Sequence, residues 1–109
     1  MGFFSRLFGQ EEETPQEVPA EYQEKGSTIP IERQGPNGEY DQSGLAKRVA
    51  IAFDNHPTLD DVETLWVAQA GTKIVLKGTV PEELISRMIS VARHVEGVSE
   101  VDSSGVTAA

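Results

Sequence analysis

The sequence predicts an α+β fold in the order α-β-β-α-β, with a mixed three-stranded sheet and two helices packed on one face of it. Apolar residues recur at helical spacing over residues 43–55 and again over residues 81–96. Between these stretches, the runs 63–69 and 73–79 are rich in apolar residues and are separated by a glycine-bearing turn. A third strand-like run begins at Val98. A disordered acidic N-terminal arm is expected to precede these elements.

The first helix is expected to run from Ser43 to Asn55. Serine is favoured at an N-cap because its hydroxyl can accept a hydrogen bond from the first turn. The helix should end before Pro57, since the residue that precedes a proline avoids the helical region. The apolar positions fall on one face and are predicted to be buried: Leu45, Ala46, Val49, Ala52 and Phe53.

The first strand, residues 63–69, has two possible orientations. Either Leu65 and Val67 point inward, or Trp66 and Ala68 do, and the alternation alone does not choose between them. Facing inward, Trp66 would belong to the core. Facing outward together with Val75, it would give the open sheet face an apolar patch for a partner.

The second strand, residues 73–79, follows a hairpin loop at residues 70–72, where Gly71 can adopt a positive φ. Ile74, Leu76 and Gly78 share one face of this strand. Because Gly78 has no side chain, it is expected to mark a close approach by a helix or by backbone.

The second helix is expected over Pro81–Glu96, with proline in its first turn and Gly97 at the position after its end. The third strand should start at Val98, include Val101 and extend at most to Val106. Residues 103–109 are small and polar and are expected to fray, with residues 107–109 as the tail. The second and third strands are expected to be parallel, joined by a right-handed crossover. The core positions of the helix are predicted to be Leu84, Ile85, Met88, Ile89, Ala92 and Val95.

The 109 residues divide into four parts by composition. Residues 1–9 form a short amphipathic apolar segment, residues 10–43 a flexible acidic linker, residues 44–106 the folded domain, and residues 107–109 the tail. Residues 1–44 carry three Lys/Arg against nine Asp/Glu, so most of the net charge of −9 lies in the arm. Ile29 and Ile31, within the linker, are candidates to pack on the domain. The apolar side chains of the first segment would share one helix face: Phe3, Phe4, Leu7 and Phe8.

Composition also argues against several functions. A chain this acidic, with no basic cluster, is a poor candidate for nucleic-acid binding. The absence of cysteine removes disulfides and thiolate metal sites. No nucleophile elbow or phosphate-binding loop is present in the sequence, so we do not expect an enzyme. No secretory signal or membrane-length apolar run is visible, which predicts a cytoplasmic protein with, at most, peripheral membrane association.

The two histidines, His56 and His94, do not form a metal-binding pair at helical spacing. His56 lies near Asp54, Asp60 and Asp61, but these residue types are also ordinary at the end of a helix. We therefore expect no metal site and no organic cofactor.

Residues 45–106 resemble the BON domain, the bacterial osmotically-induced and nodulation domain. The resemblance is carried by the helix with Leu45, Val49 and Phe53, by the run Leu76-Lys77-Gly78-Thr79-Val80, and by the run Val95-Glu96-Gly97-Val98-Ser99-Glu100-Val101. It implies a non-enzymatic binding module linked to phospholipid surfaces and osmotic stress. Many members of the family are exported, paired or lipid-anchored, whereas this chain shows one domain and no signal.

Three hypotheses follow from these patterns. The first is an adaptor that binds a membrane surface or protein partner through six residues: Phe3, Phe4, Leu7, Phe8, Trp66 and Val75. The second rests on the resemblance alone, because a cytoplasmic branch of the family is associated with potassium sensing. Potassium would be held by backbone carbonyls at the glycine-bearing turns Gly71, Gly78 and Gly97. The third is a structural homo-oligomer formed through the exposed sheet face or an edge strand.

Overall fold

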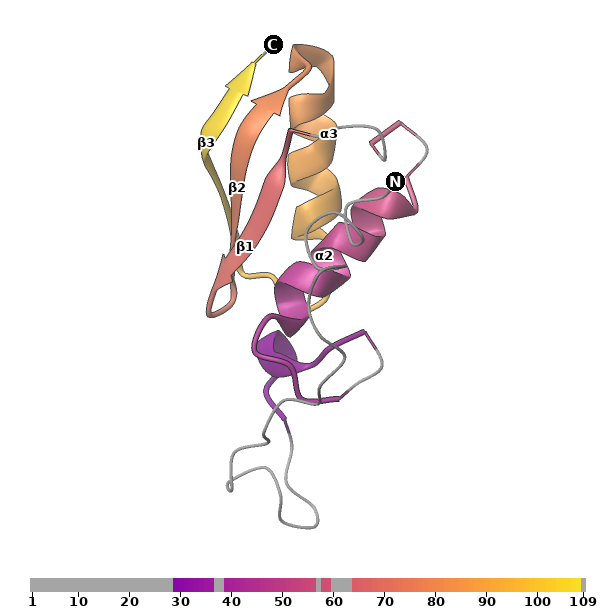
Figure 1. Ribbon diagram of the computed structural model, residues 1–109, viewed down its shortest axis with the longest axis vertical. Helices are drawn as coiled ribbons and strands as arrows, with labels where there is room; N and C mark the ends of the chain where they lie inside the picture. The colour runs from indigo at the N-terminus through magenta and orange to yellow at the C-terminus, as the bar shows by residue number, and fades with distance from the viewer. Residues whose placement is uncertain (1–28, 37–38, 57, 60–63, 109) are drawn as a thin grey trace.

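The predicted α+β class and order of elements are confirmed by a computed structural model (Figure 1), which describes residues 29–36, 39–56, 58–59 and 64–108. The amphipathic segment 1–9 and the expected disorder of the arm up to residue 28 lie outside this part. The described elements are a 3-10 helix η2 (Ile31–Arg33), helices α2 (Gly44–Asp54) and α3 (Glu82–Arg93), and strands β1 (Trp66–Ala70), β2 (Lys73–Val80) and β3 (Glu100–Ala108).

The three strands form one sheet in the order β1-β2-β3, with β1 antiparallel and β3 parallel to β2. The parallel pairing of β2 and β3 was expected, since a helix connects the two strands. Both helices lie on the same face of the sheet (Figure 1). The core therefore sits between that face and the helices, where Ile74, Leu76 and Phe53 are almost fully buried.

The structure resolves the orientation of the first strand. Leu65 and Val67 are buried, whereas 57% of the surface of Trp66 is exposed. The alternative in which Trp66 belongs to the core is wrong. The reason is that β1 alternates strictly, so the sheet face that meets the helices can take only one of the two sets of side chains.

Helix α2 buries four of the five residues predicted for its stripe, Leu45, Ala46, Val49 and Phe53. Ala52 is only half-buried, and Ala50 lies in the core instead. The expected cap is also different. Ser43 stands at the N-cap, but its side chain makes no capping hydrogen bond.

Helix α3 ends three residues before the predicted end, at Arg93, with His94 as the C-cap. Gly97 is therefore not the residue that ends the helix. With φ of 98° it turns the chain toward β3, and a Cβ there would lie 2.7 Å from the Cγ1 of Ile31. Of the predicted stripe, Met88 and Ala92 are buried; Leu84, Ile85 and Val95 pack at its border, together with Val91.

The third strand extends beyond its predicted end at Val106. Residues 103–108, which were expected to fray, belong to β3, and at its end Thr107 pairs with Thr79 and Ala108 with Val80. The cause is the length of β2, which reaches Val80 and offers pairing partners over that distance.

Gly78 marks a close backbone approach, as the sequence predicts. Its φ is 130°, and a Cβ at this position would collide with the carbonyl oxygen of Thr64, in the segment that leads into β1. Glycine is therefore needed here for both space and conformation.

The linker predicted to reach residue 43 is instead packed on the domain over its described last part. We call residues 29–36 and 39–43 the N-terminal strap. It contains η2, and Gln34 forms a bridge with Tyr40 that closes the strap on itself. Ile31 contacts the turn at Gly97, in line with its candidacy for packing. Residues 29–36 and 39–43 therefore belong to the packed domain.

Candidate functional site

The sheet face that points away from the helices is the candidate site, and we call it the outer face. Cross-strand neighbours on this face are Trp66 with Lys77 and Ala68 with Val75 on β1 and β2. On β3, Asp102 lies beside Val75 and Gly105 beside Lys77. Because successive residues of a strand point to opposite faces, these positions are the complement of the buried Leu65, Val67, Ile74 and Leu76. The outer face consists of Trp66, Ala68, Lys73, Val75, Lys77, Glu100, Asp102 and Gly105.

Trp66 dominates the outer face. Among the described residues it is the single large hydrophobic side chain that is exposed. Its cross-strand neighbour Lys77 brings a positive charge on an apolar stem, and Ala68 and the half-buried Val75 lie next to this pair. An indole with a small apolar floor beside it is suited to contacts with an apolar or aromatic group of a partner.

The side chain of Lys77 starts close to Gly105 of β3. A Cβ at Gly105 would lie only 2.9 Å from the Cγ of Lys77, so the lysine stem passes over this glycine. The aliphatic stem of Lys77 therefore covers Gly105 on β3. Trp66, on the other side of Lys77, remains highly exposed.

The charges of the outer face are balanced rather than predominantly positive. Lys73 on β2 pairs with Glu100 on β3, and Asp102, which pairs with Val75, lies between Lys73 and Lys77 along the strands. Hydrogen bonds from the hydroxyl and backbone of Ser104 lower the pKa of Asp102, and the two lysines lower it further against a small effect of burial. The charges of the two lysines are thus largely compensated by those of the two carboxylates. The outer face therefore offers little attraction for an anionic lipid surface.

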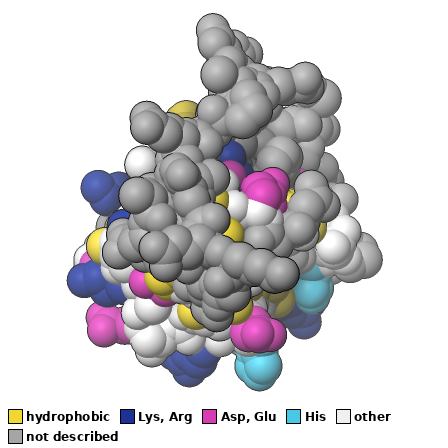
Figure 2. Space-filling model, turned by 90° about the horizontal axis from the view of Figure 1, so that it is seen from below, with side chains coloured by type: hydrophobic (Ala, Val, Ile, Leu, Met, Phe, Trp, Pro, Cys, Tyr) yellow, Lys and Arg dark blue, Asp and Glu magenta, His cyan; other side chains and the backbone are white. Residues whose placement is uncertain are grey.

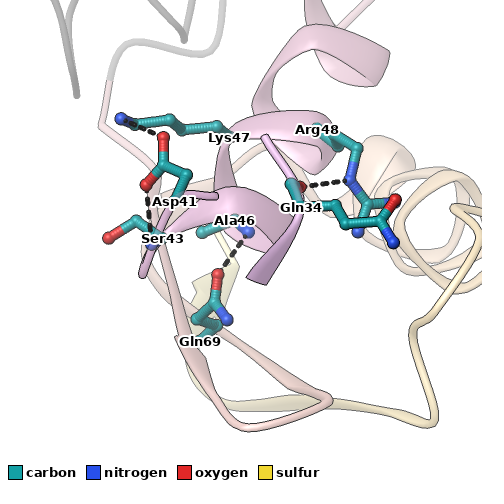
Figure 3. A network of polar contacts seen from close by, with 7 residues as sticks. All are labelled: Gln34, Asp41, Ser43, Ala46, Lys47, Arg48 and Gln69. Carbon is teal, nitrogen blue, oxygen red and sulfur yellow. Dashed lines mark hydrogen bonds and ion pairs between the residues drawn. The ribbon is translucent and has the colours of Figure 1, made fainter. Parts of the chain in front are cut away.

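A network of polar contacts fixes the strap against α2 (Figure 3). The Nζ of Lys47 donates to Asp41 Oδ2 at 2.7 Å, and both side chains are largely buried. Asp41 Oδ1 accepts from the backbone N–H of Ser43, and Gln69 Oε1 accepts from that of Ala46. Asp41 and Gln69 therefore do the capping that the sequence assigned to Ser43.

Arg48 holds the strap and the loop after α3 together. Its guanidinium donates to the backbone carbonyls of Ile31, Gln34 and Glu96. Burial lowers the pKa of Arg48, while the nearby Glu96 carboxylate raises it. An arginine stays charged under such a shift. Three carbonyl oxygens that could bind a monovalent cation are therefore already occupied by the guanidinium cation of Arg48.

The structure does not gather the three glycines considered for potassium. Gly71 in the hairpin turn and Gly97 in the loop after α3 lie at the same end, because Ser99 N–H donates to the carbonyl of Thr72. Gly78 lies five residues along β2 from Lys73, roughly 17 Å away at the usual rise of a strand. A single site made of all three carbonyls is therefore not formed.

The histidines make separate local contacts. His56 Nδ1 lies 3.1 Å from Thr58 Oγ1, and His94 Nδ1 lies 2.7 Å from the carbonyl oxygen of Ser90. Figure 2 shows the two cyan side chains apart from each other. In the described ranges, no group of three His, Cys, Asp or Glu residues is placed to hold a metal ion. Asp60 and Asp61 lie outside those ranges.

Of the six residues predicted for membrane or partner binding, the structure places two. Trp66 and Val75 come together on the outer face, on adjacent strands. Phe3, Phe4, Leu7 and Phe8 lie outside the described residues. Sequence reasoning did not single out Lys77, Asp102 or Gly105. The strand periodicity could have placed Lys77 beside Trp66 once the orientation of β1 was known.

Within the described part of the chain, none of the helices has the length and apolar character needed to cross a bilayer. Comparison with protein-family models, with curated proteins and with solved structures found no match.

Proposed function

We propose that this protein is a non-catalytic adaptor that binds a protein partner through the outer face of its sheet. The exposure of Trp66 supports this proposal most directly, since 57% of a tryptophan surface is left open on a face that the helices do not cover. Exposed aromatic side chains next to small apolar ones are typical of interaction sites. The resemblance to BON domains supports the same class of function and adds osmotic or envelope stress as its setting.

The outer face is too small to form a stable interface by itself, so a second segment of the chain should also contact the partner. Three strands spaced about 4.8 Å apart and roughly seven residues long give an area near 350 Å². A stable interface uses about 800 Å² on each partner. The apolar segment with Phe3, Phe4, Leu7 and Phe8 would supply additional area, so we propose that it and the outer face engage the same partner.

Site-specific photo-crosslinking tests the proposal. A photoreactive amino acid at Ala68, on the outer face, should give a crosslinked product of defined mass in cells. The same group at Ser86, exposed on α3, should not give it. Trp66→Ala should remove the product. Equal products from both positions, or a product insensitive to Trp66, would contradict the use of this face.

A membrane surface is the second possible target, and Trp66 reports on it directly because it is the only tryptophan. Vesicles of phosphatidylcholine and phosphatidylglycerol should leave its emission unchanged, since the charges of the outer face are balanced. A blue shift on adding vesicles, together with flotation that is lost when residues 1–9 are deleted, would favour the lipid target instead.

The potassium-sensor and homo-oligomer hypotheses make different predictions. A sensor requires amide NMR shifts at Gly71 and Gly97 that appear with potassium and not with sodium. A homo-oligomer requires a mass above the 11.8 kDa of one chain in light scattering. The small area of the outer face argues against a stable dimer formed through that face alone.

A further inference from the structure

Among the strands that the structure describes, β3 lies at an edge of the sheet, with β2 as its neighbour on one side (Figure 1). It is nine residues long, the longest strand described. An edge strand of this length presents backbone groups to which another strand can add. Lysine and proline, which commonly protect such edges, do not occur in β3.

The register between β2 and β3 is interrupted near the middle of β3. Val75 pairs with Asp102 and Lys77 pairs with Gly105. Leu76 therefore faces two residues, Ser103 and Ser104, which is the arrangement of a β-bulge. A bulge bends the strand and breaks the regular spacing that an added strand would follow.

The side chain of Asp102 closes this bulge. Its Oδ1 accepts hydrogen bonds from the backbone N–H of Ser104 at 2.9 Å and from the Ser104 hydroxyl at 2.7 Å. Because the N–H of Ser104 points to this carboxylate, it is not part of the ladder with β2. It is a backbone donor of the edge that is already satisfied within its own strand.

The contacts of Asp102 keep its carboxylate in the form that accepts these bonds. The hydrogen bonds from Ser104 lower the pKa of Asp102 most, and Lys73 and Lys77 on the adjacent strand lower it further. The charged groups around the bulge are these two lysines and Glu100. A hydrogen bond to a charged acceptor is stronger than one between neutral groups, so the bulge is held closed at neutral pH.

We propose that the Asp102–Ser104 contact at the bulge protects the β3 edge against the addition of a second strand, in particular that of a second copy of this chain. An incoming strand would need the Ser104 N–H and a straight edge. To obtain them it must break two hydrogen bonds to Asp102 and flatten the bulge. The domain would then interact through the outer face rather than by extending its sheet.

Light scattering over a concentration series tests this proposal. Asp102→Ala should increase the average mass with concentration, whereas Asp102→Asn, which keeps an oxygen acceptor, should follow the wild type. Glu100→Ala removes a charge from the same strand without opening the bulge and should also follow the wild type. If Asp102→Ala keeps the wild-type mass at every concentration, or if Glu100→Ala associates equally, the proposal fails.

Two further measurements locate the association on the molecule and test the Asp102–Ser104 contact itself. Adding Ser104→Lys to Asp102→Ala should return the mass to that of the wild type, because an edge lysine opposes strand addition. Failure of this rescue would place the association elsewhere than β3. In dilute protein, the Ser104 amide should exchange with solvent about tenfold faster in Asp102→Ala. Equal exchange rates in the two proteins would show that the contact does not hold the amide.

Discussion

The two faces of the sheet use the same strands for opposite purposes. On the inner face, Leu65, Ile74 and Leu76 are at most 1% exposed beneath α2 and α3. On the outer face, Trp66 is 57% exposed and shares its surroundings with balanced charges. The comparison shows that one set of alternating side chains is buried in the core, while the other set faces outward and carries the contact that we propose. Substitutions on the two faces should therefore separate folding from binding.

The largest expected effect compares neighbours on β2. Leu76→Ala should lower the free energy of unfolding by about 2–5 kcal/mol, because it removes buried methyl groups and leaves a cavity. Val75→Ala, on the outer face, should lower it by less than about 1 kcal/mol. Urea denaturation followed by circular dichroism measures both. Equal losses would mean that the two faces are not as different as the structure shows.

The next effect concerns the strap, which packs against α2. Asp41→Ala removes the carboxylate that the ammonium of Lys47 contacts at 2.7 Å in a largely buried position. We expect a loss of about 3 kcal/mol in the free energy of unfolding. The double variant with Lys47→Met should recover most of this loss, because no charge is then left buried. If it does not recover, the ion pair contributes through more than charge compensation.

A smaller effect distinguishes two glycines with positive φ. Gly78→Ala should cost more than about 2 kcal/mol, since the conformation is strained for alanine and the Cβ meets the Thr64 carbonyl. Gly71→Ala, where nothing lies within 4 Å of the new Cβ, should cost about 1 kcal/mol. Thermal unfolding of both variants measures the difference. A larger cost at Gly71 would contradict the close approach at Gly78.

The smallest effect is the pH dependence due to Asp102. Its pKa is lower in the folded state than the ordinary value of 3.8, so the unfolded state binds the proton more readily. The stability contribution is therefore present above pH 3.8 and is lost as the pH falls through the folded pKa. The stability difference between wild type and Asp102→Asn should be constant near neutral pH and shrink below pH 3.8. A carboxyl NMR titration midpoint above 3.8 would reverse the sign.

The order of elements was predictable from the sequence because hydrophobic periodicity records which positions must be buried. Gly78 was predictable for a similar reason, since a glycine inside an apolar strand suggests a close contact. The orientation of β1 was not, because Leu65 with Val67 and Trp66 with Ala68 alternate equally well. It depends on which set meets the helices, and no local pattern encodes this choice.

The strap and the closed bulge were beyond sequence reasoning for a different reason. Both depend on single polar side chains that reach backbone groups, such as Arg48 to three carbonyls and Asp102 to the Ser104 N–H. Hydropathy does not mark such contacts. The end of β3 was likewise set by a pairing partner on β2 rather than by its own residues.

The emission and acrylamide quenching of Trp66 in the native protein test the central claim most directly, since the signal comes from one residue. The account predicts an emission maximum and a quenching constant nearer to those of the chain unfolded in urea than to those of a buried indole, with no change in circular dichroism on Trp66→Ala. A blue-shifted emission that resists quenching, with loss of folded structure on Trp66→Ala, would contradict an open outer face.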